Sequence, residues 1–510
     1  MRIPLDVPPG LNSDDTAFAS APAWADMDGA RFRLGRAQTV GGFEAVTLTT
    51  ITGVCRTVFS WTDNTDIQHL AFGTHLALWV WKNGTLANIT PSSGFTAGAI
   101  DGAGSAGWGT GAYGAGDYGE PSATDYWPLT WSLAAYGQTL LACPRNQTLF
   151  QWSNNTAVVA AAIANAPDNI TYMGVAPTRQ VFAFGCNEEV SGTFNPVCIR
   201  HSSIADITDW TTTSSSASTS REYILPGGGR IVGARLIGRS WLVWTNHALW
   251  LGTYYGQIGK VWSFDKVGDK CGLIGPNAAV VLGQTAYWVG TEKDFHTYTL
   301  GGVTQTIVCP IRDEFANNLA FSQADKVVAS TITAQDEVRF DYPDARDGYE
   351  NSRYLSVCIS GPDAGAWSRG VQARTAMVDA GPSSYPCGVT YGGQPYWHEK
   401  GTSSDGAALA GYIETADTYL SDDNGFLLRK AFPDIEGQVG PLWLTVTTRD
   451  FAQGEATTYG PYTLTPNQDQ VDFEPKPSGK LFRFKWAWDS APAYMRMGRT
   501  LLEVKPRGRR

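Results

Sequence analysis

Charged residues are scarce in this chain: they make up 17% of its 510 residues, and aromatic residues make up 12%. No apolar period of helix length appears, and no hydrophobic run is long enough for a membrane span. The first ten residues lack the apolar stretch of a signal peptide, so we expect a soluble protein made in a cytoplasm. What the chain has instead is 56 Gly and 19 Trp, which favours short strands and tight turns over helices.

Cysteine pairs of the CxxC type are also missing. The eight cysteines are scattered and sit mostly in apolar strand patterns, so we expect them to be reduced core residues. The formal net charge of −10 argues against a protein whose main task is to neutralise nucleic-acid phosphates. It does not argue against a surface along which DNA slides, because an acidic wall repels phosphate and prevents sticking.

Short apolar segments separated by Gly, Asn, Asp and Ser turns recur along the chain. Residues 230–235, 240–245, 247–252 and 285–290 each have the pattern of one strand. Similar strand pairs return at a spacing of roughly 40 to 55 residues, the range of a four-stranded propeller blade. The sequence therefore predicts an all-β protein built on a β-propeller, with about six to eight blades.

The pattern divides the chain into three parts. Residues 1–50 are rich in Pro, Gly and Asp and have little period, so we expect an extended arm that gains order by docking on something else. Residues 51–410 carry the propeller repeat. Residues 411–510 carry longer alternating strands, which predict a β-sandwich formed by the C-terminal region together with the N-terminal arm.

A Gly/aromatic loop at residues 94–128 interrupts the propeller pattern. It contains three tandem GxGxxG sequences, but no amphipathic helix follows them, so a dinucleotide site is not predicted. Trp108, Tyr113 and Tyr118 are spaced through the loop and are its candidate contact residues. The alternative is a flexible surface loop.

Motifs that would carry catalysis or bind a metal are absent. There is no HExxH or GxSxG, and the best match to an Asp box, at residues 421–425, lacks its Trp. A carboxylate cluster has the spacing of a solvated turn rather than of a calcium loop, and an arginine triad for a carboxylate ligand would have to form in three dimensions. We predict no catalytic, cofactor-binding or metal-binding residues, hence no enzyme. The residues weighed were Asp336, Glu337, Asp341, Asp344, Asp347 and Glu350; His69 and His75; and Arg200, Arg230, Arg235, Arg239 and Arg312.

The C-terminal end is basic. Arg507, Arg509 and Arg510 are candidates for docking on an acidic partner or for facing DNA. The alternative is a solvated terminus.

Several short stretches together resemble a known family, the tail nozzle or tail-hub proteins of short-tailed bacteriophages, which are also called packaged-DNA stabilisation or tail tubular proteins. The likeness spans nearly the whole chain in short, degenerate motifs. These lie at residues 7–11, 31–35, 41–43, 111–119, 131–133, 204–210, 244–250, 447–450, 459–462 and 504–510.

The resemblance implies a structural virion protein of the phage tail, assembled in the host cytoplasm. Such proteins carry a β-propeller body and a platform made by the two chain ends. Their copies form a homohexameric ring below the portal and adaptor, above distal tail proteins or fibres. The ring retains the genome and then passes it during ejection, in transient contact with double-stranded DNA, with no cofactor and no small-molecule substrate. Under this reading, the loop with Trp108, Tyr113 and Tyr118 gates the lumen or lies at the subunit seam.

Two other classes stay open. The chain has the features of a protein- or glycan-binding propeller scaffold, which would have exposed grooves but form no ring. A glycosidase ranks lower because Asp boxes are missing.

Overall fold

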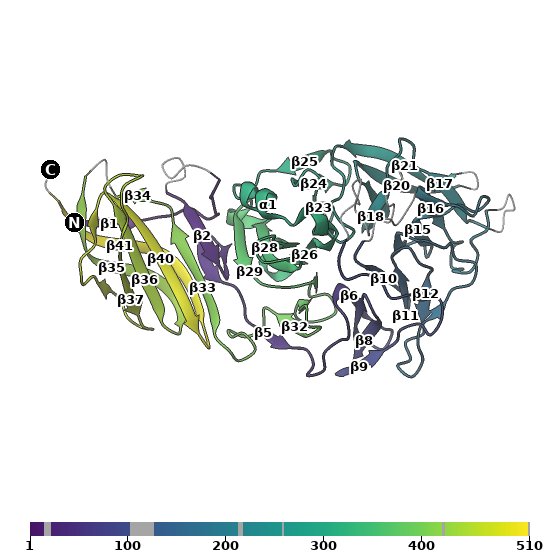
Figure 1. Ribbon diagram of the computed structural model, residues 1–510, viewed down its shortest axis with the longest axis horizontal. Helices are drawn as coiled ribbons and strands as arrows, with labels where there is room; N and C mark the ends of the chain where they lie inside the picture. The colour runs from purple at the N-terminus through teal and green to yellow at the C-terminus, as the bar shows by residue number, and fades with distance from the viewer. Residues whose placement is uncertain (15–21, 103–126, 213–217, 258–259, 421–423, 508–510) are drawn as a thin grey trace, which may run out of the picture.

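The computed structural model describes residues 1–14, 22–102, 127–212, 218–257, 260–420 and 424–507, almost all of them in strands or turns (Figure 1). Seven four-stranded sheets within these ranges form the blades of a β-propeller. Contacts link the innermost strand of each blade to that of the next, and the last contacts the first, which closes the ring. The fold is the predicted all-β propeller, and its blade number lies inside the predicted range.

In each of the first four blades, the four strands follow one another in the chain from the innermost strand outward. Blade 1 is β6(Cys55–Thr62), β7(Gln68–Thr74), β8(Leu78–Lys82) and β9(Thr85–Asn88); blade 2 is β10(Trp131–Tyr136), β11(Thr139–Pro144), β12(Phe150–Trp152) and β13(Ala161–Ala162); blade 3 is β14(Tyr172–Val175), β15(Val181–Asn187), β16(Phe194–His201) and β17(Arg221–Ile224); blade 4 is β18(Ile231–Ile237), β19(Ser240–Thr245), β20(Ala248–Gln257) and β21(Lys260–Asp269).

The remaining blades include the only sheet of the seven, within the described residues, that joins distant parts of the chain. Blade 5 is β22(Ala279–Leu282), β23(Thr285–Val289), β24(Phe295–Thr299) and β25(Thr304–Ile307); blade 6 is β26(Val328–Ile332), β27(Glu337–Pro343), β28(Asn351–Cys358) and β29(Trp367–Val371); blade 7 is β30(Ala376–Val378), β31(Cys387–Val389), β32(Pro395–His398) and, as its outermost strand, β5(Phe43–Ala45). The N-terminal segment thus closes the propeller by completing its last blade.

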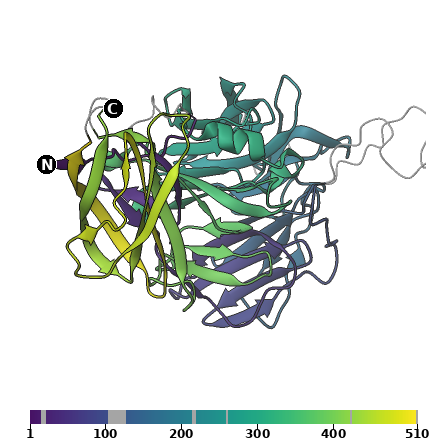
Figure 2. The same cartoon turned by 60° about the vertical axis from the view of Figure 1, so that its left-hand side comes forward.

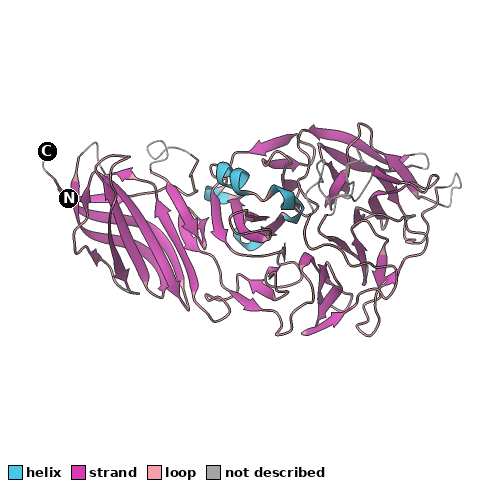
Figure 3. Ribbon diagram, viewed as in Figure 1, coloured by secondary structure: helices cyan, strands magenta, loops and turns pink. Residues whose placement is uncertain are grey.

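Short helices occur between and within the late blades. Helix α1(Arg312–Asn318) and the 3-10 helix η1(Phe321–Lys326) connect blade 5 to blade 6. Blade 6 itself contains η2(Thr333–Gln335) and η3(Gly361–Asp363). Figure 3 shows these helices together beside the sandwich end of the propeller.

Strands from both ends of the chain build a two-sheet sandwich. One sheet contains β3(Ala30–Arg33), β4(Arg36–Thr39), β41(Tyr494–Pro506), β35(Phe426–Val439) and β38(Val471–Asp472), with β1(Arg2–Leu5) paired to β41 and β39(Ser478–Gly479) paired to β35. The other contains β2(Trp24–Asp28), β33(Leu409–Thr415), β40(Leu481–Ser490), β36(Leu442–Arg449) and β37(Thr457–Leu464), with β34(Thr418–Tyr419) paired to β40. Both termini lie at the end of the sandwich away from the propeller (Figure 2).

Alternation of apolar and polar residues explains the sandwich strands. In β36 and β40 every second side chain is buried, so each sheet turns one face to the shared core and the other outward. The predicted sandwich of C-terminal region and N-terminal arm is confirmed. The arm needs no other protein to gain order, because β1 to β4 pair with this chain's own C-terminal strands or with each other.

Large aromatic side chains fill the cores. Phe182 lies between blades 3 and 4 with ring centroids 5.3 Å from Trp241 and 5.2 Å from Trp262. One continuous apolar cluster runs from the sandwich, with Trp24 and Trp486, into blade 6, with Phe340 and Trp367. The tryptophans that are almost completely buried are Trp131, Trp152, Trp210, Trp244, Trp262, Trp288, Trp367, Trp486 and Trp488.

The outermost strand of blade 6, β29, joins the propeller to the sandwich by contacts with β2 and β3. Arg369 on β29 pairs with Asp26 on β2 at 2.5 Å, and the amide of Val371 donates to Asp28. Arg31 on β3 reaches into blades 6 and 7, where it pairs with Glu399 at 2.5 Å and lies 3.5 Å from Glu337. The joint is therefore both apolar and ionic.

Candidate functional site

The aromatic residues that the sequence singled out, Trp108, Tyr113 and Tyr118, lie outside the described residues, which stop at Gly102 and resume at Trp127. The structure does describe both ends of this loop, and each end is fixed to the propeller by charged side chains. The positions of these ends show from which part of the propeller the loop arises.

The first end is fixed on η1. Lys326, whose side chain is fully buried, donates from its ammonium to Asp101 at 2.6 Å, to Glu350 at 2.7 Å and to the carbonyl of Tyr349 at 2.5 Å. The side-chain amide of Gln323 exchanges two hydrogen bonds with the backbone of Gly102, at 2.9 and 2.7 Å. All three ammonium protons of Lys326 therefore have acceptors, as a buried cation requires.

The second end is fixed through Trp127. The guanidinium groups of Arg145 and Arg230 lie 4.5 and 4.6 Å from its ring centroid. Arg145 also reaches Asp325 of η1 at 3.4 Å. Arginine over an indole face is held by the negative potential of the ring, so one indole links blades 2 and 4.

The two anchors meet over one end of the propeller axis. Arg56, near the start of β6, pairs with both carboxylate oxygens of Glu350 at 2.7 Å each and donates to the carbonyl of Ile100 at 2.9 Å. Since Glu350 belongs to blade 6 and Arg56 to blade 1, this pair crosses the end of the axis where the innermost strands begin.

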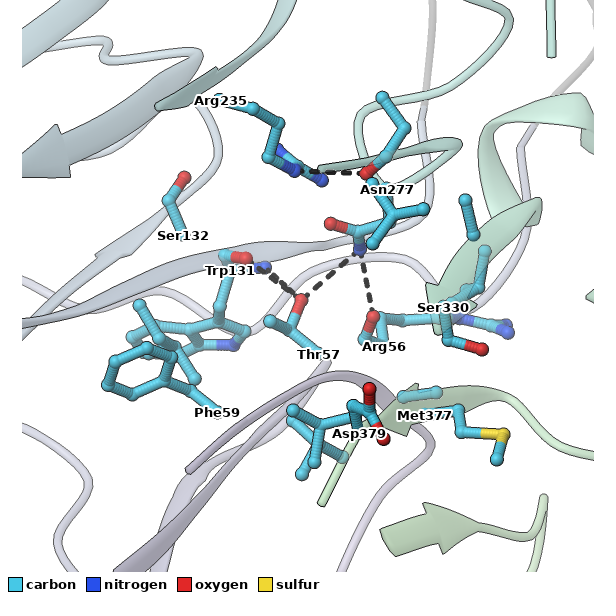
Figure 4. A pocket seen from close by; sticks show the side chains of 18 of the residues that line it. Arg56, Thr57, Phe59, Trp131, Ser132, Arg235, Asn277, Ser330, Met377 and Asp379 are labelled. Carbon is cyan, nitrogen blue, oxygen red and sulfur yellow. Dashed lines mark hydrogen bonds between the residues drawn. The ribbon is translucent and has the colours of Figure 1, made fainter. Parts of the chain in front are cut away.

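Below these ion pairs lies a cavity of about 340 Å³, lined by the innermost strands of all seven blades (Figure 4). Its volume falls at the lower end of the range for small-molecule sites. The wall is mainly apolar, with Val58, Phe59, Leu133, Val280 and Val378 among its residues.

Arg235 on β18 is a cationic group of this cavity. It donates to the carbonyls of Ala234, Pro276 and Ala279 at 2.9, 3.0 and 3.0 Å, and to the hydroxyl of Tyr172. No carboxylate of the described residues forms an ion pair with it. The fixed guanidinium thus faces the cavity without a neutralising partner.

The other polar groups of the cavity are nearly all satisfied. Asn277 donates to the carbonyl of Arg56 at 2.9 Å and to Thr57 at 3.3 Å. Asp379 accepts from the hydroxyl of Thr331 at 2.7 Å and from the amide of Ala380 at 2.7 Å. Ser330, which is 3% exposed, has a hydroxyl without a hydrogen-bond partner.

Of the predicted basic tail, the structure describes Arg507, and Arg509 and Arg510 lie outside the described residues. The side chain of Arg507 is 52% exposed and lies 3.7 Å from Asp450, while its amide donates to the carbonyl of Gly425 at 2.7 Å. A half-exposed ion pair of this kind contributes little to stability, which leaves the guanidinium accessible to a partner.

The carboxylate cluster weighed in the sequence is divided among separate ion pairs. Asp341 pairs with Arg339 at 2.6 Å and Asp344 with Arg346 at 2.7 Å. Glu337 lies near Arg31, Asp347 pairs with Arg353, and Glu350 pairs with Arg56 and Lys326. Asp336 caps the end of η2. Among the described residues, no group of three or more His, Cys, Asp or Glu side chains is arranged to hold a metal ion.

All eight cysteines and five of the six histidines have buried side chains, and His247 is exposed. His69 donates from Nε2 to the carboxylate of Asp63 at 3.2 Å, and His75 accepts the amide proton of Val54 at 3.0 Å, so the two do not form a pair. All eight cysteines are free and buried, as predicted; burial raises the pKa of the Cys55 thiol to about 12.

The candidate arginines do not converge on one ligand. Arg235 lines the axial cavity, Arg230 packs on Trp127, and Arg312 pairs with Asp294. Arg200 donates to the carbonyls of Asn187 and Trp210.

No protein-family model matches the chain, and comparison with characterised proteins gives no significant match. Solved structures with a similar fold include the β-propeller domain of Cps50 (Swd1) from Myceliophteria thermophila, at 9% identity over 69% of this chain and 98% of that one, TM-score 0.40. BBS1N in complex with ARL6DN matches at 10% identity over 71% and 98%, TM-score 0.40, and YCF48 bound to D1 peptide at 10% over 70% and 97%, TM-score 0.38. At these identities and TM-scores, the likenesses carry no argument about function.

Within the described ranges, no helix is long and apolar enough to cross a membrane.

Sequence reasoning did not find the axial cavity. Tyr172, Asn277, Ser330 and Asp379 come from four different blades, and each is an ordinary strand or turn residue in its own segment. Arg235 was singled out only as one of several arginines. Closure of the ring brings these residues together, and no local pattern marks that closure.

Proposed function

We propose that this protein is a structural component of a phage tail, a nozzle or hub subunit whose copies form a ring-shaped conduit below the portal and adaptor. The observation that carries the proposal is the placement of a closed propeller between two chain ends that jointly build one sandwich. The resembling family has this organisation, with the propeller as body and the joined ends as platform. The proposal includes no catalytic step.

The position of the termini supports the same assignment. Both lie at the end of the sandwich away from the propeller. Arg507 is half-exposed there, and together with Arg509 and Arg510, which lie outside the described residues, it is our candidate for docking on an acidic neighbour. The formal net charge of −10 suits a wall along which DNA moves without sticking. The neighbours proposed are the portal or adaptor on one side and distal tail proteins or fibres on the other.

The first experiment measures the mass of the purified protein by mass photometry and images it by negative-stain microscopy, alone and with candidate tail partners. A sixfold ring with a central hole, formed alone or with a partner, is the expected result. A strict monomer under every condition would contradict the conduit and favour a propeller scaffold for a protein or glycan. A glycan array would then separate those two classes.

A second experiment tests the proposed gate or seam loop. Deleting residues 104–119 keeps Gly102 and Trp127 on their anchors, so the fold should survive while ring assembly or DNA retention fails. A triple variant, with Trp108, Tyr113 and Tyr118 each changed to Ser, should act in the same direction. Tyr391→Ser, at an exposed aromatic residue elsewhere on the propeller, is the matched control. Normal assembly and infectivity of the deletion variant would contradict a role for this loop.

A further inference from the structure

Arg235 and Tyr172 both line the axial cavity, and each keeps a donor proton that no hydrogen bond among the described residues uses. The four bonds that Arg235 makes to protein oxygens leave one of its five guanidinium protons free. Tyr172 accepts one of those bonds, so its own hydroxyl proton remains available to another acceptor. A guanidinium proton beside a phenol proton matches the two oxygens of a carboxylate.

No carboxylate of the described residues forms an ion pair with this donor pair, although the cavity lining includes Asp379. Arg56, the other arginine of the lining, is neutralised by Glu350. Asp379 lies across the cavity from Arg235 (Figure 4) and is engaged by Thr331, Thr333 and Ala380. An anion is therefore favoured at the Arg235 side, and a second anionic group reaching the far side is disfavoured by Asp379.

The remaining residues that line the cavity determine which kind of ligand body can bind there. Val58, Phe59, Leu133 and Val280 offer an apolar wall between the two charged sides. The buried hydroxyl of Ser330 has no partner in the protein, and an unmatched buried hydroxyl is costly. Occupation of the cavity by a ligand or by water that reaches this hydroxyl removes that cost.

We propose that the axial cavity is a binding site for a small organic monocarboxylate with an apolar body. The carboxylate binds Arg235 and Tyr172, and the apolar body lies against the walls of blades 1, 2 and 5. The ion pairs of Arg56 and Lys326 over one end of the axis direct entry to the other end. The site binds a ligand and catalyses no reaction, and the proposal does not depend on the proposed tail function.

The test uses the full chain and measures binding by isothermal titration calorimetry and saturation-transfer NMR. The probe is 4-methylpentanoate, compared with 4-methylpentanamide, which lacks the charge, and with adipate, which carries a second carboxylate. Saturable binding of the acid, about tenfold or more tighter than that of either comparison compound, is expected for a charge-assisted pair. Equal binding of acid and amide, or no saturable binding of the acid up to its solubility limit, would overturn the proposal.

A carboxylate at a peptide C-terminus has the same chemistry as the free acid. The tripeptide Ala-Ala-Leu, with a free or an amidated C-terminus, tests that source. Binding of the free form with loss on amidation supports the carboxylate site and identifies a partner's chain end as a ligand. Binding of the small acid but not of the tripeptide restricts the site to small molecules.

Two variants assign the binding to the named residues. Arg235→Gln should weaken binding of 4-methylpentanoate about tenfold or more, and Tyr172→Phe should weaken it about threefold to tenfold while keeping the guanidinium. Arg230→Gln, an arginine outside the cavity, is the control and should bind as the unmodified protein does. If Arg235→Gln fails to fold, Tyr172→Phe decides, and unchanged affinity in that variant would overturn the assignment.

Discussion

Buried histidines show how single residues make the stability of this fold depend on pH. His201 is fully buried in blade 3, with its ring 5.0 Å from that of Phe182 and its Nδ1 atom 3.0 Å from the amide nitrogen of Gln180. Burial is the main cause that lowers the pKa of His201 to about 4. Burial lowers the pKa of His69 to about 4 as well. These side chains stay neutral where exposed histidines would be charged.

The first prediction follows from that shift. Because the pKa of His201 is lower in the folded chain than the usual 6.5, the unfolded chain takes up a proton first as the pH falls. Above pH 6.5 the pKa shift of His201 does not reduce the free energy of unfolding. Between pH 6.5 and about 4 the shift lowers that free energy by roughly 3 kcal/mol. Urea unfolding at a series of pH values should show His201→Gln with a shallower pH dependence than the unmodified protein. Identical slopes would contradict this account of His201.

At the scale of elements, strand β5 closes the propeller and thereby fixes the N-terminal segment to blade 7. β5 completes blade 7 by pairing with β32, and the following segment returns to blade 1 through Ile51, whose amide donates to the carbonyl of Gly393 at 2.8 Å. Gly393 lies in the turn between β31 and β32 with φ +79°. A Cβ atom there would lie 2.1 Å from the carbonyl oxygen of Ile51.

Gly393→Ala should therefore destabilise the protein by about 2 kcal/mol or more, because it adds left-handed backbone strain to a clash with the backbone. Gly392→Ala is the matched control, since a Cβ atom at Gly392 has nothing within 4 Å. The control should change stability by less than about 0.5 kcal/mol. Chemical unfolding followed by tryptophan fluorescence measures both. Equal effects of the two substitutions would show that this turn does not secure the closure.

The elements themselves were largely readable from sequence. The strands expected at residues 240–245 and 285–290 are confirmed as β19 and β23, because each is a short, mainly apolar run between turn residues. The arm at residues 1–50 was expected to be extended with little period. Its strands β1 to β5 are each three to five residues long, too short to show a period of two. Apart from the hairpin of β3 and β4, their pairing partners lie hundreds of residues away.

For the whole molecule, the joint between sandwich and propeller is the feature that links two domains into one unit. Arg31 is 3% exposed and lies between Glu399 and Glu337. Burial alone would lower the pKa of Arg31, and the charges of the two glutamates outweigh that effect and raise it. The cation is thus held by residues of blades 6 and 7 while its strand belongs to the sandwich.

Arg31→Leu should destabilise the protein by about 3 kcal/mol, because it leaves the buried carboxylate of Glu337 and the partly buried one of Glu399 without their cation. Calorimetry should also show the thermal transition separating into two as the joint loosens. Arg33→Leu, at an exposed position of the same strand, should leave the transition nearly unchanged. A single transition of unchanged midpoint in Arg31→Leu would show that the apolar contacts alone hold the joint.

The sequence by itself determined the strand-rich class, the propeller repeat, the sandwich and the buried free cysteines. These follow from local composition and from a period of two, which act over a few residues. Only the tertiary structure decided that the ring closes at seven blades with β5, that Arg56 and Glu350 meet over the axis, and that Arg235 lines the axial cavity without an ion-pair partner. Those features depend on contacts between residues far apart in the chain, and a local pattern carries no information about which distant segment will lie opposite.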